Sequence, residues 1–308
     1  MVGSHLAPFL ARQGQSVAGT FYRPTTVLPV HPAGYTLQEM DVRYCQSVAK
    51  IVAALRPQTI YHLAAQSQPA VSWERPQETM DTNVTGTVNV YEAVRAVRAV
   101  DPSYDPMVVA ACSSAQYGAS LLTADGPASE EAAFLPLHPY GVSKVATDLL
   151  SWQYFKSDGI RCIRARIFNT SGPRKTGDVI SDFARRIAAL PAGGGRLRTG
   201  TLDTRRAFLH VEDLIAALTA LSLKGTPGEA YNISGEQVVS IGELIPMFEA
   251  AAGFQITPDI DRKLLRPTDE PVIMGSTAKL RRDTGWLPRH TVPGLVADVY
   301  AYEKALVA

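Results

Sequence analysis

The chain has 308 residues, of which 46% are hydrophobic and 19% are charged, and its formal net charge is +1. These values are typical of a globular protein with one large domain or two modest ones, and they argue against a nucleic-acid partner, which usually needs a basic stripe. The longest apolar stretch, residues 214–223, is too short to span a bilayer, and no signal peptide is visible, so we expect a cytoplasmic protein with no membrane partner.

The cysteines predict neither a disulfide framework nor a metal site. Cys45, Cys112 and Cys162 are widely spaced and lie in or near apolar runs. Disulfide-rich and zinc-binding chains place their cysteines at short, regular spacings. We therefore expect buried free thiols, which fit a reducing cytoplasm.

Short β-rich runs alternate with longer helical patterns along the chain. The expected strands are Val17–Phe21, Thr59–Leu63, Met107–Cys112, Cys162–Phe168 and Ala230–Ile233. The expected helices are Gly3–Arg12, Gln46–Leu55, Gln77–Val97, Tyr140–Lys156, Val211–Leu223, Ile241–Ala252 and Pro293–Lys304. Alternation of this kind predicts an α/β fold with a Rossmann-like, doubly wound parallel sheet. No strand precedes the helix at Gly3, so the first strand of such a sheet is missing from the expected series.

The second half of the chain has a different composition. Residues 169–206 are rich in Gly, Pro and Arg, and residues after 234 show helices and loops without a strong strand series. We expect residues 1–168 with 207–235 to form a dinucleotide-binding domain. Residues 169–206 with 236–308 are then a smaller, C-terminal substrate-binding domain at the carboxyl edge of the sheet.

The segment Tyr140-Gly-Val-Ser-Lys144 follows Pro139, a residue well placed to begin a helix. Tyr140 and Lys144 are one turn apart and share a face, while Val142, Val145, Leu149 and Trp152 predict the buried stripe of that helix. A phenol with a pKa of about 10 is a poor acid–base catalyst at neutral pH, and a cation one turn away lowers that pKa. The pair is then able to move a proton to or from a carbonyl or alcohol oxygen. The same pattern also occurs on ordinary surface helices.

Two further segments follow expected strands. Ser113 and Ser114 come directly after 107–112, and His62-Leu63-Ala64-Ala65-Gln66 ends the strand 59–63. Ligands bind at the carboxyl ends of strands in open α/β sheets, so the Ser113 hydroxyl is a candidate donor to the oxygen that Tyr140 protonates. Ser113 is also compatible with a turn cap, and we expect His62 to be a core histidine.

These three elements, in this order, resemble the extended short-chain dehydrogenase/reductases, the NAD-dependent epimerase/dehydratase family, whose members modify nucleotide sugars. The resemblance covers almost the whole chain. It implies that Ser113, Tyr140 and Lys144 are the catalytic set and that Asn83 lies near the active site. Such proteins often dimerise through a four-helix bundle, which residues 77–97 and 140–156 would supply in a homodimer.

The second half is most similar to the branch of GDP-mannose 4,6-dehydratases and GDP-6-deoxy-4-keto-mannose reductases. Segments 165–175, 179–187, 202–208 and 266–286 carry this similarity. It implies a GDP-sugar substrate and a substrate-binding set of Ser114, Asn169, Val179, Arg206, Arg266 and Asp269. Forked guanidinium groups suit phosphate oxygens, although each arginine taken alone also fits a solvated surface charge.

The resemblance also predicts a cofactor site. The family fingerprint is G-x-x-G-x-x-G, and only its last glycine is present, as Gly3; either the true start lies upstream or the phosphate loop is truncated. After the strand 17–21 the chain has Arg23 and no acid, which favours NADP(H), with NAD(H) as the alternative. The expected cofactor-binding residues are Gly3, Arg23, Asp41, Leu63, Ala64, Ala65, Gln66, Tyr140 and Lys144.

The residue at position 115 separates two reactions. A 4,6-dehydratase needs a carboxylate there to remove a proton, and this chain has Ala115, which has no titratable group. The resemblance therefore implies NADPH-dependent reduction of the C4 keto group of GDP-4-keto-6-deoxy-D-mannose to GDP-D-rhamnose. The alternatives are the dehydratase or another nucleotide-sugar 4-epimerase and, because the glycine loop is incomplete, a non-catalytic dinucleotide-binding protein.

Overall fold

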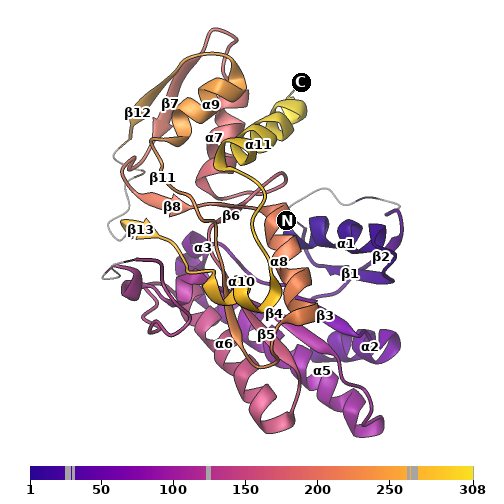
Figure 1. Ribbon diagram of the computed structural model, residues 1–308. Coiled ribbons are helices and arrows are strands. Elements are labelled where there is room, and N and C mark those ends of the chain that lie inside the picture. The colour runs from indigo at the N-terminus through magenta and orange to yellow at the C-terminus, as the bar shows by residue number, and fades with distance from the viewer. Residues whose placement is uncertain (25–28, 30–31, 123–125, 262–263, 265–269, 308) are drawn as a thin grey trace.

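A four-stranded parallel sheet forms the centre of the protein (Figure 1). The computed structural model describes residues 1–24, 29, 32–122, 126–261, 264 and 270–307. The strands lie in the order β10 (Ala230–Ile233), β5 (Cys162–Ile167), β4 (Met107–Ser113) and β3 (Thr59–His62), and each neighbouring pair is parallel. This arrangement confirms the predicted α/β class, and all four strands begin where the sequence predicts them.

Helices cover both faces of this sheet. On one face α2 (Cys45–Leu55), α5 (Gly86–Val100) and α6 (Pro139–Asp158) pack against Val108 and Cys162. On the other face α8 (Val211–Lys224) and α10 (Ala278–Thr284) pack against Val109 and Ile163. Successive strand residues point to opposite faces, so the continuous apolar run of β4 serves both layers and the fold is doubly wound.

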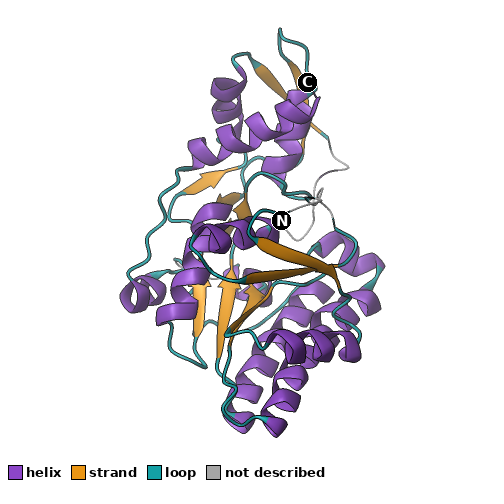
Figure 2. Ribbon diagram, turned by 90° about the vertical axis from the view of Figure 1, so that its right-hand side faces the viewer, coloured by secondary structure: helices purple, strands orange, loops and turns teal. Residues whose placement is uncertain are grey.

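The N-terminal strands form a pair of their own. β1 (Val17–Phe21) pairs in parallel with β2 (Tyr35–Glu39), next to α1 (Val2–Arg12), and β3 pairs with β4. Figure 2 shows the β1–β2 pair apart from the central strands. Among the described residues no strand pairs with both β1 and β3, which matches the gap that the sequence predicts in the strand series.

The segment predicted as one helix over 77–97 is divided. It comprises α4 (Pro76–Met80), a π-helical turn (Asp81–Thr85) and the beginning of α5, and α3 (Pro69–Glu74) precedes it. The apolar pattern runs through all three parts, so periodicity alone does not reveal the wider turn. Two short 3-10 turns, Ser114–Gln116 and Ala119–Leu121, follow β4.

A second hydrophobic core lies in the upper part of Figure 1, where α7 (Val179–Ala188), α9 (Leu244–Ala252) and α11 (Val292–Val307) pack around Phe248. Beside it β7 (Gly195–Thr199) pairs with β12 (Ile256–Ile260). The small strands β8 (Arg205–Ala207), β11 (Val238–Ser240) and β13 (Val272–Ile273) form a sheet, and β6 (Thr170–Ser171) pairs with β9 (Leu209–His210). After residue 234 the sequence shows no strong strand series, but the structure has β11, β12 and β13 there; two of them are only two or three residues long, which is too short to show an alternating pattern.

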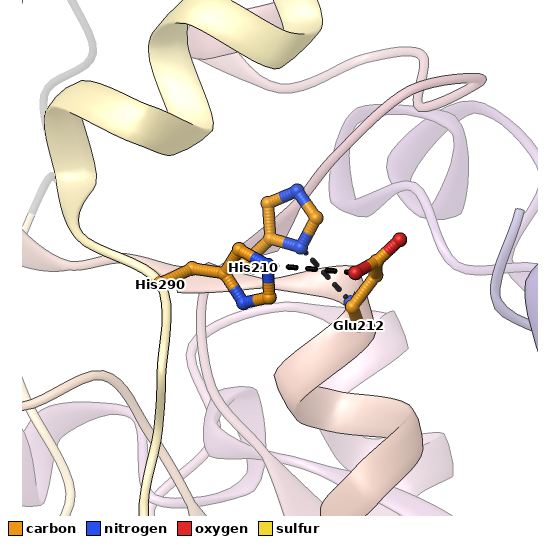
Figure 3. A group of neighbouring side chains, drawn as sticks. All are labelled: His210, Glu212 and His290. Atoms are coloured by element: carbon orange, nitrogen blue, oxygen red, sulfur yellow. Dashed lines mark hydrogen bonds and ion pairs between the residues drawn. The ribbon is translucent and has the colours of Figure 1, made fainter.

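Near the beginning of α8, side-chain contacts connect this helix with the segment that precedes α11 (Figure 3). The His210 and His290 rings stack with their centroids 4.2 Å apart. His210 Nδ1 accepts a hydrogen bond from the Glu212 amide, and His290 Nε2 lies 3.4 Å from a Glu212 carboxylate oxygen. The buried Asp213 carboxylate contacts His290 Nδ1 at 3.0 Å and accepts from the His290 amide. These contacts fix the polypeptide that leads into the second core.

Two expectations about burial are wrong. Cys112 and Cys162 are buried free thiols as predicted, but Cys45 is exposed. On α6, Val142, Leu149 and Trp152 are 45%, 50% and 44% exposed, because the helix turns its Tyr140–Lys144 face toward the sheet and not its apolar stripe. No helix within the described part of the chain is long and apolar enough to cross a membrane.

Candidate active site

The first turn of α6 places Tyr140 and Lys144 against the sheet. Pro139 begins the helix, and the Gly141 amide donates to His138 Nδ1 at 3.0 Å. A Cβ at Gly141 would lie 2.6 Å from the Ala115 carbonyl oxygen, so this glycine lets the helix approach the turn after β4 closely. Tyr140 and Lys144 are only 9% and 5% exposed, which excludes the alternative of an ordinary surface pair.

The Lys144 ammonium donates to the Ala111 carbonyl of β4 at 2.8 Å and lies 5.9 Å from the centre of the Tyr140 ring. Burial lowers the pKa of Lys144 to about 8. Burial also raises the pKa of Tyr140, and a hydrogen bond with Ser113 offsets this rise only in part. The expectation that the cation lowers the pKa of Tyr140 is therefore wrong, because desolvation of the phenolate outweighs the attraction. Tyr140 holds its proton at neutral pH, as a proton donor must.

Ser113 is the last residue of β4 and caps the turn Ser114–Gln116. Its hydroxyl oxygen accepts from the Ala115 amide at 3.2 Å, so its hydrogen points away from the turn and is the one that interacts with Tyr140. Ser113, Tyr140 and Lys144 all line one cleft of about 2680 Å³. The structure thus brings together the three side chains that the sequence places in the catalytic set.

The same cleft collects the other predicted site residues. Its described lining includes Gly3, Arg23, Asp41, Leu63, Ala64, Ala65, Gln66, Ser114, Asn169, Val179 and Arg206. Arg266 and Asp269 lie outside the described residues. Lining a common cleft is compatible with the predicted roles, which for each of these residues stay predictions.

One end of the cleft is cationic and aromatic. Tyr22 lies beneath two guanidinium groups, those of Arg23 at 5.1 Å and Arg43 at 5.4 Å from its ring centre. Arg43 also binds the Asp41 carboxylate, with Nη2 2.6 Å from Oδ2. Arg43 also lines the cleft, and it is not among the residues that the sequence predicts for this site.

The buried Asn83 connects the loop after β3 with α6. Its Oδ1 accepts from the Gln66 amide and its Nδ2 donates to Ser143 Oγ, both at 2.8 Å. Asn83 lies in the π-helical turn, and the wider turn directs its side chain between the two elements. Ser143 in turn donates to the Tyr140 carbonyl, which is compatible with the expected place of Asn83 near the active site; its role stays a prediction.

Polar groups also line the opposite end of the cleft. Asn169 follows β5, and its Nδ2 is buried without a hydrogen-bond partner in the described structure. Arg206 Nη1 donates to the Glu270 carbonyl at 2.7 Å. Val179 is the first residue of α7, which Asp178 caps by accepting from the Ser181 amide at 2.8 Å. A buried amide without a partner costs free energy unless a ligand satisfies it.

Comparison with known proteins agrees with this geometry. The family described as GDP-mannose 4,6 dehydratase matches residues 1–299. The chain belongs to this family.

One relative of this chain is a GDP-6-deoxy-D-mannose reductase from Pseudomonas aeruginosa. The two are 32% identical over 294 residues, which cover 94% of this chain and 90% of that protein. Among solved structures, RMD from Pseudomonas aeruginosa complexed with NADPH has a TM-score of 0.81 and 26% identity, covering 95% of this chain and all of that one. A Thermus thermophilus UDP-glucose 4-epimerase complexed with NAD has a TM-score of 0.84 and 26% identity, covering 99% and 96%. These relatives thus include a GDP-sugar reductase and a UDP-sugar epimerase, and the two solved structures contain NADPH and NAD.

The residues present in this family member fit a nicotinamide dinucleotide. The guanidinium groups at Tyr22 suit a 2′-phosphate, and the small residues Ala64 and Ala65 leave the backbone after β3 open to a flat ring. Lys144 uses one of its three hydrogens on Ala111, which leaves two for ribose hydroxyls. Gly3 lines the cleft at the beginning of α1, where helix amides attract phosphate.

Proposed function

We propose that this protein is an NADPH-dependent reductase that converts the C4 keto group of GDP-4-keto-6-deoxy-D-mannose into the hydroxyl of GDP-D-rhamnose. The observation that carries the proposal is the grouping of Ser113, Tyr140 and Lys144 in one cleft beside Ala115, a residue without a carboxylate. The reductase relative, similar over 94% of this chain, supports the substrate class.

The chain's own residues manage the proton and the orientation of the substrate. When bound, NADPH supplies the hydride that C4 receives. Tyr140 gives its proton to the C4 oxygen, and the hydroxyl hydrogen of Ser113 holds that oxygen in place. Lys144 remains charged and stabilises the tyrosinate that results. The hydride adds to the C4 carbon and the proton adds to the C4 oxygen, so the carbonyl becomes one alcohol and the step is balanced.

For the other parts of the substrate we propose Asn169, Val179 and Arg206 as contacts, with Ser114 beside the sugar. The buried Asn169 amide without a partner supports a polar ligand at that end. We also propose that residues 1–168 with 207–235 hold the cofactor, and that residues 169–206 with 236–308 hold the nucleotide sugar. The separate core around Phe248 supports this division.

We further propose a homodimer in the cytoplasm. The exposed apolar stripe of α6, formed by Val142, Leu149 and Trp152, supports a second copy packed along this helix, because monomers rarely leave such a stripe in water. The free thiols of Cys112 and Cys162 suit a reducing compartment.

The decisive experiment incubates the protein with GDP-4-keto-6-deoxy-D-mannose and NADPH, follows the nicotinamide absorbance and identifies the sugar product. We expect turnover by the wild type and a loss of about 10²- to 10⁴-fold for Tyr140→Phe, with NADPH binding retained. A Tyr140→Phe protein that reduces the keto sugar at the wild-type rate would show that the assignment is wrong.

The family match also favours a second candidate, the 4,6-dehydratase. Incubation with GDP-mannose separates the two, because only a dehydratase forms the keto sugar from it. A non-catalytic dinucleotide-binding protein would bind NADPH in a titration and leave both sugars unchanged.

A further inference from the structure

The turn after β4 decides where the Ser113 hydroxyl lies. The Ser113 amide donates to Gln116 Oε1 at 3.3 Å, and the Ser113 hydroxyl accepts from the Ala115 amide at 3.2 Å. These two bonds close the turn on itself. Any shift of the turn moves the hydroxyl relative to Tyr140.

Gln116 ties this turn to the helix that carries Tyr140. The side chain is fully buried, and its Nε2 donates to Asp148 Oδ2 at 3.0 Å. Asp148 lies on α6 one turn after Lys144 and two turns after Tyr140, so all three share one face. An amide is suited to this bridge because it accepts from one partner and donates to the other.

Two arginines of β5 hold Asp148 in place. Arg164 Nη1 lies 2.7 Å from Asp148 Oδ1, and Arg166 Nε lies 2.8 Å from Oδ2. Burial opposes the charge on Asp148, but Arg166 and then Arg164 outweigh it and lower the pKa of the carboxyl. The carboxylate therefore keeps its charge in a site where it is 0% exposed.

Arg166 of the same cluster also binds the residue that follows Gln116 in the turn. Arg166 Nη1 donates to the Tyr117 hydroxyl at 2.9 Å and to the Glu130 carbonyl at 2.6 Å. Tyr117 directly follows Gln116, and its hydroxyl donates to Asn232 Oδ1 at 2.7 Å. The turn is thus fixed at two adjacent residues.

Stability alone gives a weak reason for such a cluster. Buried ion pairs are often replaceable by apolar side chains with no loss of stability, because desolvation offsets their attraction. Satisfied polar networks do specify one arrangement of the groups they join. Here those groups are the two halves of the catalytic set.

We infer that Gln116 and Asp148 are positioning residues, whose bridge holds the Ser113 hydroxyl at the reacting oxygen while Tyr140 delivers its proton. The inference rests on the proposed reductase function. Misplacement of a reacting group by about 1 Å costs on the order of 10²-fold in rate, so loss of the bridge lowers kcat while the cofactor and sugar still bind.

The test uses the full chain with NADPH and the keto sugar. Gln116→Met keeps the length of the side chain and removes both hydrogen bonds. We expect its kcat to fall about 10- to 100-fold, with both KM values within about two-fold of the wild type. The matched control is Tyr154→Phe, which removes the hydrogen bond from the Tyr154 hydroxyl of α6 to the Glu92 carboxylate. Because Tyr154 lies far along the helix from Tyr140, we expect this variant to have a lower melting temperature and an unchanged kcat.

A swap of the two side chains separates positioning from mere folding. Gln116→Glu keeps the acceptor for the Ser113 amide and loses the donor to Asp148, while Asp148→Asn leaves two arginines without their carboxylate. In the double variant the new amide at 148 donates to the new carboxylate at 116, and the cluster again contains one negative charge besides its two arginines. We expect the double variant to recover kcat above either single variant.

The outcomes are distinct. A wild-type kcat in Gln116→Met would overturn the positioning role while the proposed function stands. The same conclusion would follow if kcat fell, both KM values rose with it, and the double variant did not recover kcat. A wild-type protein that leaves the keto sugar unchanged would overturn the proposed function and, with it, the catalytic meaning of the bridge.

Discussion

Among single residues, Lys144 has the clearest pH signature. Its pKa is lowered to about 8 by burial, so the free enzyme loses the ammonium as pH rises through that value. We expect kcat/KM for the keto sugar to fall above pH ~8 with a slope of one on a logarithmic plot. Lys144→Arg keeps its charge at these pH values and should remove the fall, whatever its absolute rate. The same fall in both proteins would contradict the assignment to Lys144.

At the residue scale, we propose that Arg23 and Arg43 decide the choice of cofactor. Both guanidinium groups lie over Tyr22, and a charge-assisted hydrogen bond to a phosphate is worth about 1.5–3 kcal/mol. The double substitution Arg23→Ala and Arg43→Ala removes two such bonds and should raise the KM for NADPH by about 10²-fold or more. The KM for NADH is the internal control and should change little. Equal weakening of both cofactors would argue that these arginines serve the fold and not the 2′-phosphate.

At the scale of elements, the two opposite faces of α6 differ in what they contact. Its polar face carries Tyr140, Lys144 and Asp148 against the sheet, and its apolar stripe is exposed. Leu149→Lys with Trp152→Lys should weaken dimerisation at least about ten-fold, because each buried large apolar side chain contributes roughly 1.5–3 kcal/mol. Light scattering after gel filtration measures the mass, and Leu306→Lys on α11, which is 63% exposed, is the control. A dimer that survives the double substitution would place the interface elsewhere.

For the whole molecule, buried neutral histidines predict sensitivity to acid. Burial lowers the pKa of His62 from 6.5 to about 3, so the unfolded chain takes up the proton first as pH falls. The contribution of His62 to the free energy of unfolding is fully present above its unfolded pKa. This contribution falls by about 2 kcal/mol as the pH decreases from 6.5 to 5. Urea unfolding at pH 7 and pH 5 should show a smaller loss for His62→Gln than for the wild type. Identical losses would mean that His62 is not the group that titrates.

The sequence by itself determined what depends on neighbours along the chain. Helical spacing placed Tyr140 and Lys144 on one face, and the apolar runs located every strand of the central sheet. It also indicated the gap between β1 and β3. Such features follow from the backbone's own periods and need no knowledge of distant contacts.

Only the tertiary structure decided which face of each element is buried and which distant side chains meet. Gln116 and Asp148 are 32 residues apart in sequence, and their contact exists because β4, β5 and α6 pack together. The apolar stripe of α6 predicted burial but is exposed within one chain, since the sheet packs against the polar face that carries Tyr140 and Lys144. Local sequence fixes the period of a helix, whereas strand order and packing fix its rotation.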